Sequence, residues 1–144
     1  MRLHEWLFGE SASEADTAVG REMHETTGAV VLGRRVFDVG LGEWEDTPFS
    51  VPCFVVTHRA NDDLVQRSGT FSFITKWIEH ALQRARDSAG EKDVRLMGAD
   101  IAQQFLEAGL VDEFTINLAP VFLAKAPGCS SIKARIGSSW TFCG

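Results

Sequence analysis

The sequence predicts an α/β fold, a three-layer sandwich in which helices cover both faces of a mainly parallel central sheet. Short, continuously apolar runs, which are typical of strands buried on both faces, alternate with amphipathic stretches of helical spacing. The chain has 144 residues, of which 44% are hydrophobic, and this is enough to build one hydrophobic core. We therefore expect one domain over residues 1–144.

The first predicted elements are a helix, a buried strand and a second, short helix. Ser11 and Glu14 have the spacing of a capping box, so a helix is expected from Ser11 to Thr27, with Gly28 ending it. Residues 29–32 are continuously apolar and predict the buried strand. Residues 34–39 predict the short helix.

The loop that follows is marked by glycines and a proline, and we expect Trp44 to anchor it. Residues 54–57 repeat the pattern of a buried strand, whereas residues 70–74 alternate polar and apolar side chains, as a half-exposed strand does. Thr75 is the expected N-cap of a long amphipathic helix that ends at Gly90.

The last predicted elements form a strand, a helix and a second strand. Residues 94–97 predict a strand, and Gly98-Ala99 a tight turn. A helix is expected over residues 100–108, with Asp100 as its N-cap, and a longer strand over residues 113–122. Trp77 is expected to pack the long helix that precedes them, although an aromatic ring near the sheet edge could also stack on a flat ligand ring.

Composition excludes several classes of protein. The formal net charge is -6, which argues against a large basic surface for nucleic acid but leaves room for a local anion site. No apolar run approaches the ~20 residues that cross a bilayer, and no secretory signal is recognised, so we expect a cytoplasmic protein that binds neither membrane nor nucleic acid. The three cysteines show no CxxC spacing, so neither a disulfide framework nor a metal site is indicated.

Three short motifs follow predicted strands. Gly33-Arg34-Arg35 comes where a buried strand meets a helix, so backbone N–H groups and a guanidinium could converge on a phosphate. Taken alone, this tripeptide is better explained as two solvated arginines. Thr57-His58-Arg59 also follows a buried strand and suits a second phosphate, but no nucleophile or orienting carboxylate accompanies His58 at a recognisable spacing.

The third motif is Gly98-Ala99-Asp100-Ile101, where small residues would let the backbone approach a ligand closely. Its lack of a full GxGxxG argues against a classical dinucleotide fingerprint, and Asp100 would repel a phosphate placed directly against it. Because parallel strands end at one edge of a sheet, the three motifs together predict an anion site at that edge.

Four segments carry a family resemblance: Val31–Asp38, Phe54–Arg59, Gly98–Glu113 and Ala119–Val121. They resemble the dihydrofolate-reductase-like family that includes the reductase domain of bacterial riboflavin biosynthesis, the RibD C-terminal domain. The resemblance runs from about residue 27 to residue 123 and implies NADPH as the cofactor. It also implies a homodimer.

The resemblance implies that the three motifs line the cofactor. Gly33 and Arg34 would line its phosphates, and Thr57 and Arg59 would take the adenosine 2′-phosphate. The segment Gly98 to Ile101 would face the pyrophosphate and the nicotinamide. The full set of expected cofactor-binding residues is Gly33, Arg34, Arg35, Thr57, His58, Arg59, Gly98, Ala99, Asp100 and Ile101.

Both ends depart from the family pattern. The usual first strand is not found, and the tail is atypical from about residue 124. Our hypothesis for the tail is a shifted reading frame, because codons for Ala-Lys-Ala-Pro-Gly-Cys-Ser can, when displaced, encode the family-like Gly-Gln-Gly-Thr-Arg-Leu-Phe. No proton donor can be assigned, since the family position that could supply one falls in these segments.

The resemblance implies an NADPH-dependent reductase that transfers hydride to a small heterocyclic or sugar-linked substrate, such as 5-amino-6-(5-phosphoribosylamino)uracil. A catalytically degenerate nucleotide-binding domain is the alternative, and the missing first strand favours it. A generic α/β domain with solvated arginines is a third possibility, and it predicts no NADPH binding.

Overall fold

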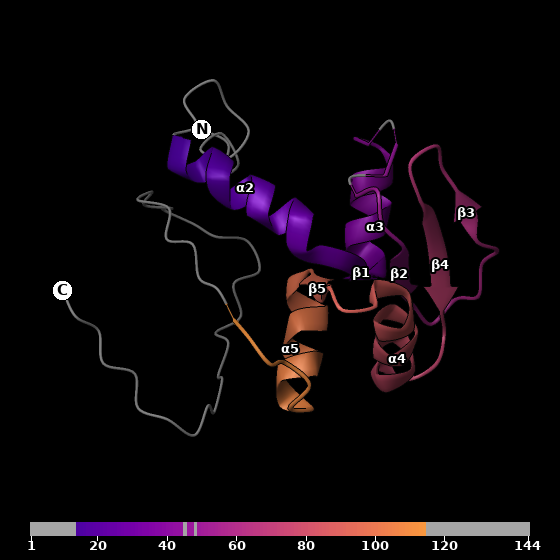
Figure 1. Ribbon diagram of the computed structural model, residues 1–144. Helices are drawn as coiled ribbons and strands as arrows, with labels where there is room; N and C mark the ends of the chain where they lie inside the picture. Colours follow the sequence, from indigo (N-terminus) through magenta and orange to yellow (C-terminus); the bar gives the residue numbers. More distant parts are fainter. Residues whose placement is uncertain (1–13, 45, 48, 115–144) are drawn as a thin grey trace, which may run out of the picture.

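The computed structural model describes residues 14–114 apart from 45 and 48, and its centre is a mixed, mainly parallel sheet (Figure 1). Within these residues the sheet has five strands in the order β3-β4-β2-β1-β5. The strands are β1 (Thr27–Gly33), β2 (Cys53–Val56), β3 (Leu64–Val65), β4 (Thr70–Ile74) and β5 (Asp93–Met97). Only the β3–β4 pair is antiparallel among the strand pairs described.

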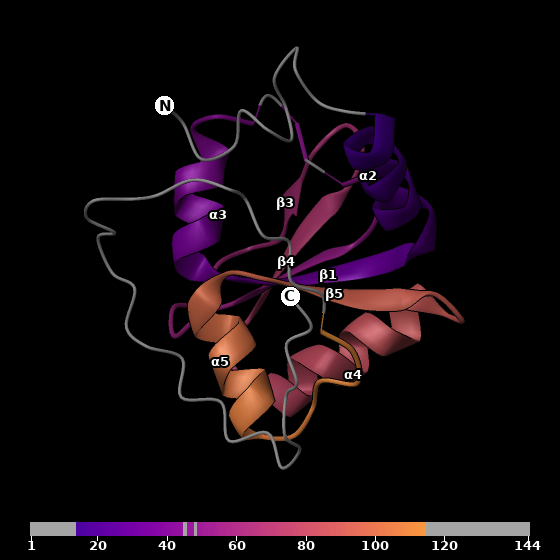
Figure 2. The same ribbon diagram turned by 90° about the vertical axis from the view of Figure 1, so that its left-hand side faces the viewer.

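Helices lie on both faces of the sheet, as the sequence predicts. They are α2 (Glu14–Thr26), α3 (Arg34–Leu41), α4 (Ile78–Ala89) and α5 (Ala99–Glu107). Figure 2 shows α4 and α5 on one side of the sheet and α2 and α3 on the other. The three-layer α/β sandwich is therefore confirmed for the described part of the chain.

The core is divided by the sheet into two clusters. Residues of β1 contribute to both, because successive side chains of a strand point to opposite faces. Val31 packs with α4 and α5, whereas Leu32 packs with Phe37 of α3. Ala29, Val30, Val31 and Leu32 are each at most 1% exposed, so the continuously apolar run is buried on both faces as predicted. Burying each valine or leucine side chain stabilises the fold by roughly 1.5–3 kcal/mol.

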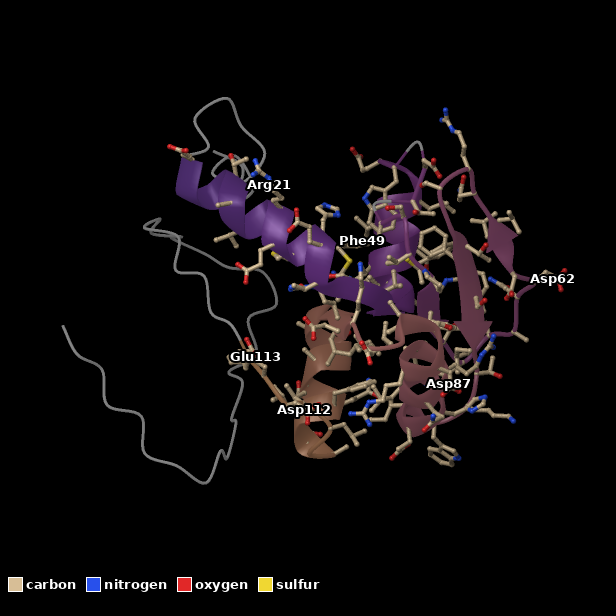
Figure 3. The ribbon with its side chains drawn as sticks, in the orientation of Figure 1. Arg21, Phe49, Asp62, Asp87, Asp112 and Glu113 are labelled. Carbon is tan, nitrogen blue, oxygen red and sulfur yellow. The ribbon has the colours of Figure 1, made fainter. Side chains whose placement is uncertain are left out.

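The aromatic side of the core fixes α3 and the loop after it. The rings of Phe37 and Phe71 meet edge to face, 5.1 Å apart between centroids. Trp44 stacks on Phe71 with an interplanar angle of 2°, which confirms that it anchors its loop. On the same side, Phe49 lies between α2 and α3 (Figure 3), where its ring is 5.9 Å from that of His24. Aromatic contacts thus tie both helices to this side of the sheet.

Several element predictions are wrong in detail. The first described helix ends at Thr26, and Gly28 belongs to β1. Strand β4 is more buried than expected, because Ser72 and Ile74 are also covered on the α4 side. The two-residue strand β3 was not predicted, since so short a strand has no periodicity of its own.

The N-cap of α4 was also wrongly assigned. Trp77, not Thr75, is the N-cap residue, with an extended backbone and no side-chain capping bond. Trp77 is 83% exposed, so it does not pack the helix as expected. The helix ends before Gly90, as predicted. The Ser11 cap, most of the predicted 113–122 strand and the tail from 124 lie outside the described residues.

Candidate functional site: the carboxyl edge of the parallel strands

The three motifs meet at one edge of the sheet. Strand β1 lies between β2 and β5, and the register pairs Gly33 with Val56 and Leu32 with Met97. Thr57 and Gly98 are the residues that follow Val56 and Met97. All three motifs therefore begin at the same level of the sheet, as the parallel pairing of their strands predicts.

Two helices begin side by side at this edge. Gly33 is the N-cap of α3 and Gly98 is the N-cap of α5, and neither cap makes a side-chain hydrogen bond. Figure 2 shows α3 and α5 starting next to each other and running in opposite directions away from the sheet. The first N–H groups of a helix have no partner within the helix, so the edge presents two sets of backbone donors. Such donors, together with the positive ends of two helix dipoles, favour an anion.

Close packing at the edge requires small residues. Gly98 has a φ of +108°, and a Cβ atom built on it would lie 2.7 Å from Cγ2 of Val36. A Cβ atom on Gly33 would lie 3.1 Å from Cγ1 of Ile101. The backbone of Gly33 in the first motif therefore lies against the side chain of Ile101 in the third motif. Ile101 itself is 4% exposed and packs in the core, so only its backbone N–H can serve a ligand.

Charge at the start of the two helices is unbalanced. The first turn of α3 has no acidic residue and begins with Arg34 and Arg35, which the helix dipole disfavours at this end. A bound anion would offset that cost. Asp100 lies in the first turn of α5, where its charge suits the dipole. The prediction that Asp100 is the N-cap is wrong, because the N-cap is Gly98, two residues earlier. The Asp100 carboxylate repels a phosphate placed next to it.

The second motif forms a hydrogen-bonded turn. The Thr57 N–H donates to the Ile74 carbonyl (3.0 Å), and the Arg59 N–H donates to the Thr57 hydroxyl oxygen (3.1 Å). Thr57 is 7% exposed, whereas His58 and Arg59 are exposed. The turn thus directs two basic side chains into solvent beside the helix starts. Arg35 and Arg59 make no ion pair within the described residues.

Arg34 is held in place on several sides. Its Nε donates to Oδ1 of Asp38 (2.7 Å), and its guanidinium lies 5.6 Å from the ring centroid of Phe37 and 5.8 Å from that of Phe73. With its amide oxygen turned toward Arg34, Asn61 accepts a hydrogen bond from Nη1 (2.8 Å), and its amide nitrogen donates to the Ala60 carbonyl (2.8 Å). Asn61 and Phe73 were not predicted as neighbours of Arg34, since no sequence motif connects them to it.

A pocket of about 380 Å³ lies beside this arginine. It is bounded by α3, by the loop before β3 and by β4, and Asp62 projects outward from that loop (Figure 3). Its lining residues are Arg34, Phe37, Asp38, Leu41, Asn61, Asp62, Leu64 and Phe73. The pocket therefore combines aromatic surface, one guanidinium and two carboxylates.

Two further features of the described residues bear on the predictions. Among residues 14–114 apart from 45 and 48, no group of three histidine, cysteine or acidic side chains is placed to hold a metal ion. None of the helices in this part of the chain has the length and apolar character needed to cross a membrane.

The fold and the site define an α/β domain whose parallel strands present backbone N–H groups and arginines at their carboxyl ends. The chain belongs to the RibD C-terminal domain family, whose sequence model matches residues 4–133. This match confirms the resemblance drawn from the motifs to the dihydrofolate-reductase-like reductases.

A solved structure agrees with the family assignment. The chain is similar to a protein named "Putative riboflavin biosynthesis protein" from Shewanella sp. PV-4, with a TM-score of 0.52 and 21% sequence identity. The similarity covers 75% of this chain and 60% of that protein, so the chain spans less than two thirds of its length. No curated protein matches the sequence. At this identity the solved structure supports the fold.

Proposed function

We propose that the carboxyl edge of β1, β2 and β5 binds NADPH and that the protein is an NADPH-dependent reductase of the riboflavin-biosynthesis type. The observation that carries the proposal is the meeting of two helix N-termini at glycine caps, with two arginines in the first turn of α3. Family membership adds the expected cofactor, because proteins with RibD C-terminal domains are related to NADPH-dependent reductases.

The residues at the edge fit a phosphate-bearing cofactor. Gly98 and Gly33 let α3 and α5 begin in contact with each other, because a Cβ atom on either residue would press on Val36 or Ile101. The N–H groups from Ala99 to Ile101 would face the pyrophosphate, while Arg34 and Arg35 would supply positive charge from α3. NADPH would supply the hydride, and this chain would hold and orient it.

The second motif would distinguish NADPH from NADH. Arg59 is exposed and makes no ion pair within the described residues, so its guanidinium is available for the 2′-phosphate. The Thr57 hydroxyl accepts from the Arg59 N–H and keeps its own hydrogen for donation to a phosphate oxygen. His58 would add a third polar group to this corner.

The proposed substrate is a small heterocycle or sugar-linked heterocycle related to 5-amino-6-(5-phosphoribosylamino)uracil. The test begins with binding, because hydride transfer requires it. Purified protein is titrated with NADPH and NADH while nicotinamide fluorescence is followed, and oxidation of NADPH is then measured with the candidate substrate. NADPH binding with turnover supports the whole proposal. Binding without turnover supports a nucleotide-binding domain that lacks activity, and no binding to either nucleotide overturns the proposal.

A further inference from the structure

We infer that Asn61 is a positioning residue that acts through Arg34, holding its guanidinium ready for a phosphate at the sheet edge. The inference deepens the proposed function and rests on it, because it assigns a role in the proposed phosphate site to a residue outside the three motifs. Asn61 lies in the loop between β2 and β3, two residues after Arg59.

Arg34 is oriented by neighbours from three parts of the chain. Asp38 belongs to the same helix, and Phe73 belongs to β4. Helical side chains lean toward the N-terminus, so Asp38 reaches back one turn and keeps the guanidinium near the start of α3. Asn61 supplies the contact from the loop that carries Thr57 to Arg59.

Part of the Arg34 guanidinium keeps N–H donors that could still bind a ligand. Asp38 accepts from Nε and Asn61 accepts from Nη1, while Phe37 and Phe73 lie against the guanidinium. Within the described residues, no hydrogen bond involves Nη2 of Arg34. A guanidinium presents five N–H donors in a fixed fork, so the Nη donors left over can still take a phosphate oxygen.

Asn61 is suited to hold the Arg34 guanidinium because its side chain carries no charge. Its amide oxygen accepts from Arg34 while its amide nitrogen is used by the Ala60 carbonyl, so the side chain is fixed at both ends. An aspartate here would form a second ion pair with Arg34 and weaken its attraction for a phosphate. The neutral amide therefore orients the guanidinium without adding a second negative charge to that of Asp38, and such preorganisation lowers the cost of binding.

The test compares Asn61→Ala, Arg34→Ala and the double variant in NADPH titrations at several salt concentrations. Gln66→Ala is the matched control, since it truncates another side-chain amide in the neighbouring hairpin. We expect Asn61→Ala to weaken NADPH binding about three- to tenfold and to have no added effect when Arg34 is already alanine. We also expect both single variants to reduce the salt dependence of binding, which a purely structural role would leave unchanged.

Wild-type affinity in Asn61→Ala, or additive effects in the double variant, would overturn the inference. If the wild-type protein itself binds no NADPH, the proposed function fails, and that result is seen before any variant is tested. The link between Asn61 and Arg34 is then tested without ligand by amide hydrogen exchange in residues 57–63. Equal acceleration in the two single variants supports the positioning role, and unchanged exchange contradicts it.

Discussion

The backbone of Gly98 lies against the side chain of Val36, so the start of α5 touches the first turn of α3. A Cβ atom on Gly98 would come within 2.7 Å of Val36 Cγ2, closer than carbon atoms normally approach. The residue also has a φ of +108°, which side chains disfavour. This contact brings the two helix N-termini to one point.

Replacing Gly98 with alanine is therefore expected to destabilise the protein by about 2–4 kcal/mol, from backbone strain and overpacking together. Binding of NADPH should weaken as well, because the two helix starts are pushed apart. Urea unfolding and fluorescence titration measure the two effects. Gly90→Ala is the control, since Gly90 also has a positive φ (+63°) but nothing within 4 Å of its would-be Cβ atom. Equal losses in both variants would show that the contact with Val36 is unimportant.

Arg59→Ala should weaken NADPH binding by about 10-fold or more, because a hydrogen bond to a charged group contributes roughly 1.5–3 kcal/mol. The affinity for NADH should change little, since that nucleotide lacks the 2′-phosphate. Arg67→Ala provides the comparison, because the Arg67 side chain is 84% exposed and its ion pair with Asp46 belongs to another loop. The prediction is contradicted if both nucleotides lose affinity equally.

Asp100→Asn should strengthen NADPH binding a few-fold, because it removes a negative charge from the first turn of α5. The same substitution should lower stability by about 0.3–1 kcal/mol, since the carboxylate interacts favourably with the helix dipole. Titrations at low and moderate salt, with thermal unfolding alongside, separate the two effects. Glu91→Gln removes the same charge from an exposed turn and should leave binding unchanged. Weaker binding in Asp100→Asn would instead indicate a direct role for the carboxylate.

Burial raises the pKa of the Cys53 thiol from 9.0 to about 12. The thiol is therefore neutral in the folded protein, and the Cys53 side chain is only 1% exposed. For both reasons, alkylating reagents should modify Cys53 only after unfolding. Mass spectrometry of the peptide that contains Cys53 distinguishes it from Cys129 and Cys143. Labelling in the native state would contradict the prediction.

The same pKa shift predicts how stability depends on pH. In the unfolded chain the thiol ionises near pH 9, whereas in the folded chain it stays protonated to about pH 12. The stability gained by keeping this thiol protonated in the folded state is complete below pH 9. It is lost as the pH rises toward 12, by up to about 1.4 kcal/mol per pH unit. Urea unfolding at pH 8 and pH 10 measures the loss. A Cys53→Val variant should lose less stability over this interval than the wild-type protein.

The sequence predicted the elements around the site well because the strands that carry it are strongly patterned. The run from Ala29 to Leu32 is buried on both faces, and such a continuously apolar run is typical of a central parallel strand. The ends of β1, β2 and β5 followed directly, because glycine or a polar residue interrupts each apolar run. The common location of the three motifs could be argued from parallel pairing alone.

Other features depend on long-range contacts that local patterns do not encode. Trp77 was expected to pack its helix, but the chain is extended there and the indole is exposed. Asp100 resembled an N-cap, yet Gly98 takes that position because only glycine fits beside Val36 with a positive φ. The bridge from Arg34 to Asn61 joins segments that the sheet brings together, and no spacing in the sequence indicates it.

The position of β1 between β2 and β5 has a consequence for folding. Gly33 pairs with Val56, and Leu32 pairs with Met97. The carboxyl edge is therefore complete only after β5, which is far from β1 in the sequence, has paired with β1. A partly folded chain that lacks β5 would have no nucleotide site. The nucleotide would then bind only the native state, so the melting temperature would rise with nucleotide concentration. At a concentration of 100 times Kd, the free energy of unfolding would increase by about 2.7 kcal/mol. The nucleotide would thus bind only to chains in which β5 has joined the sheet.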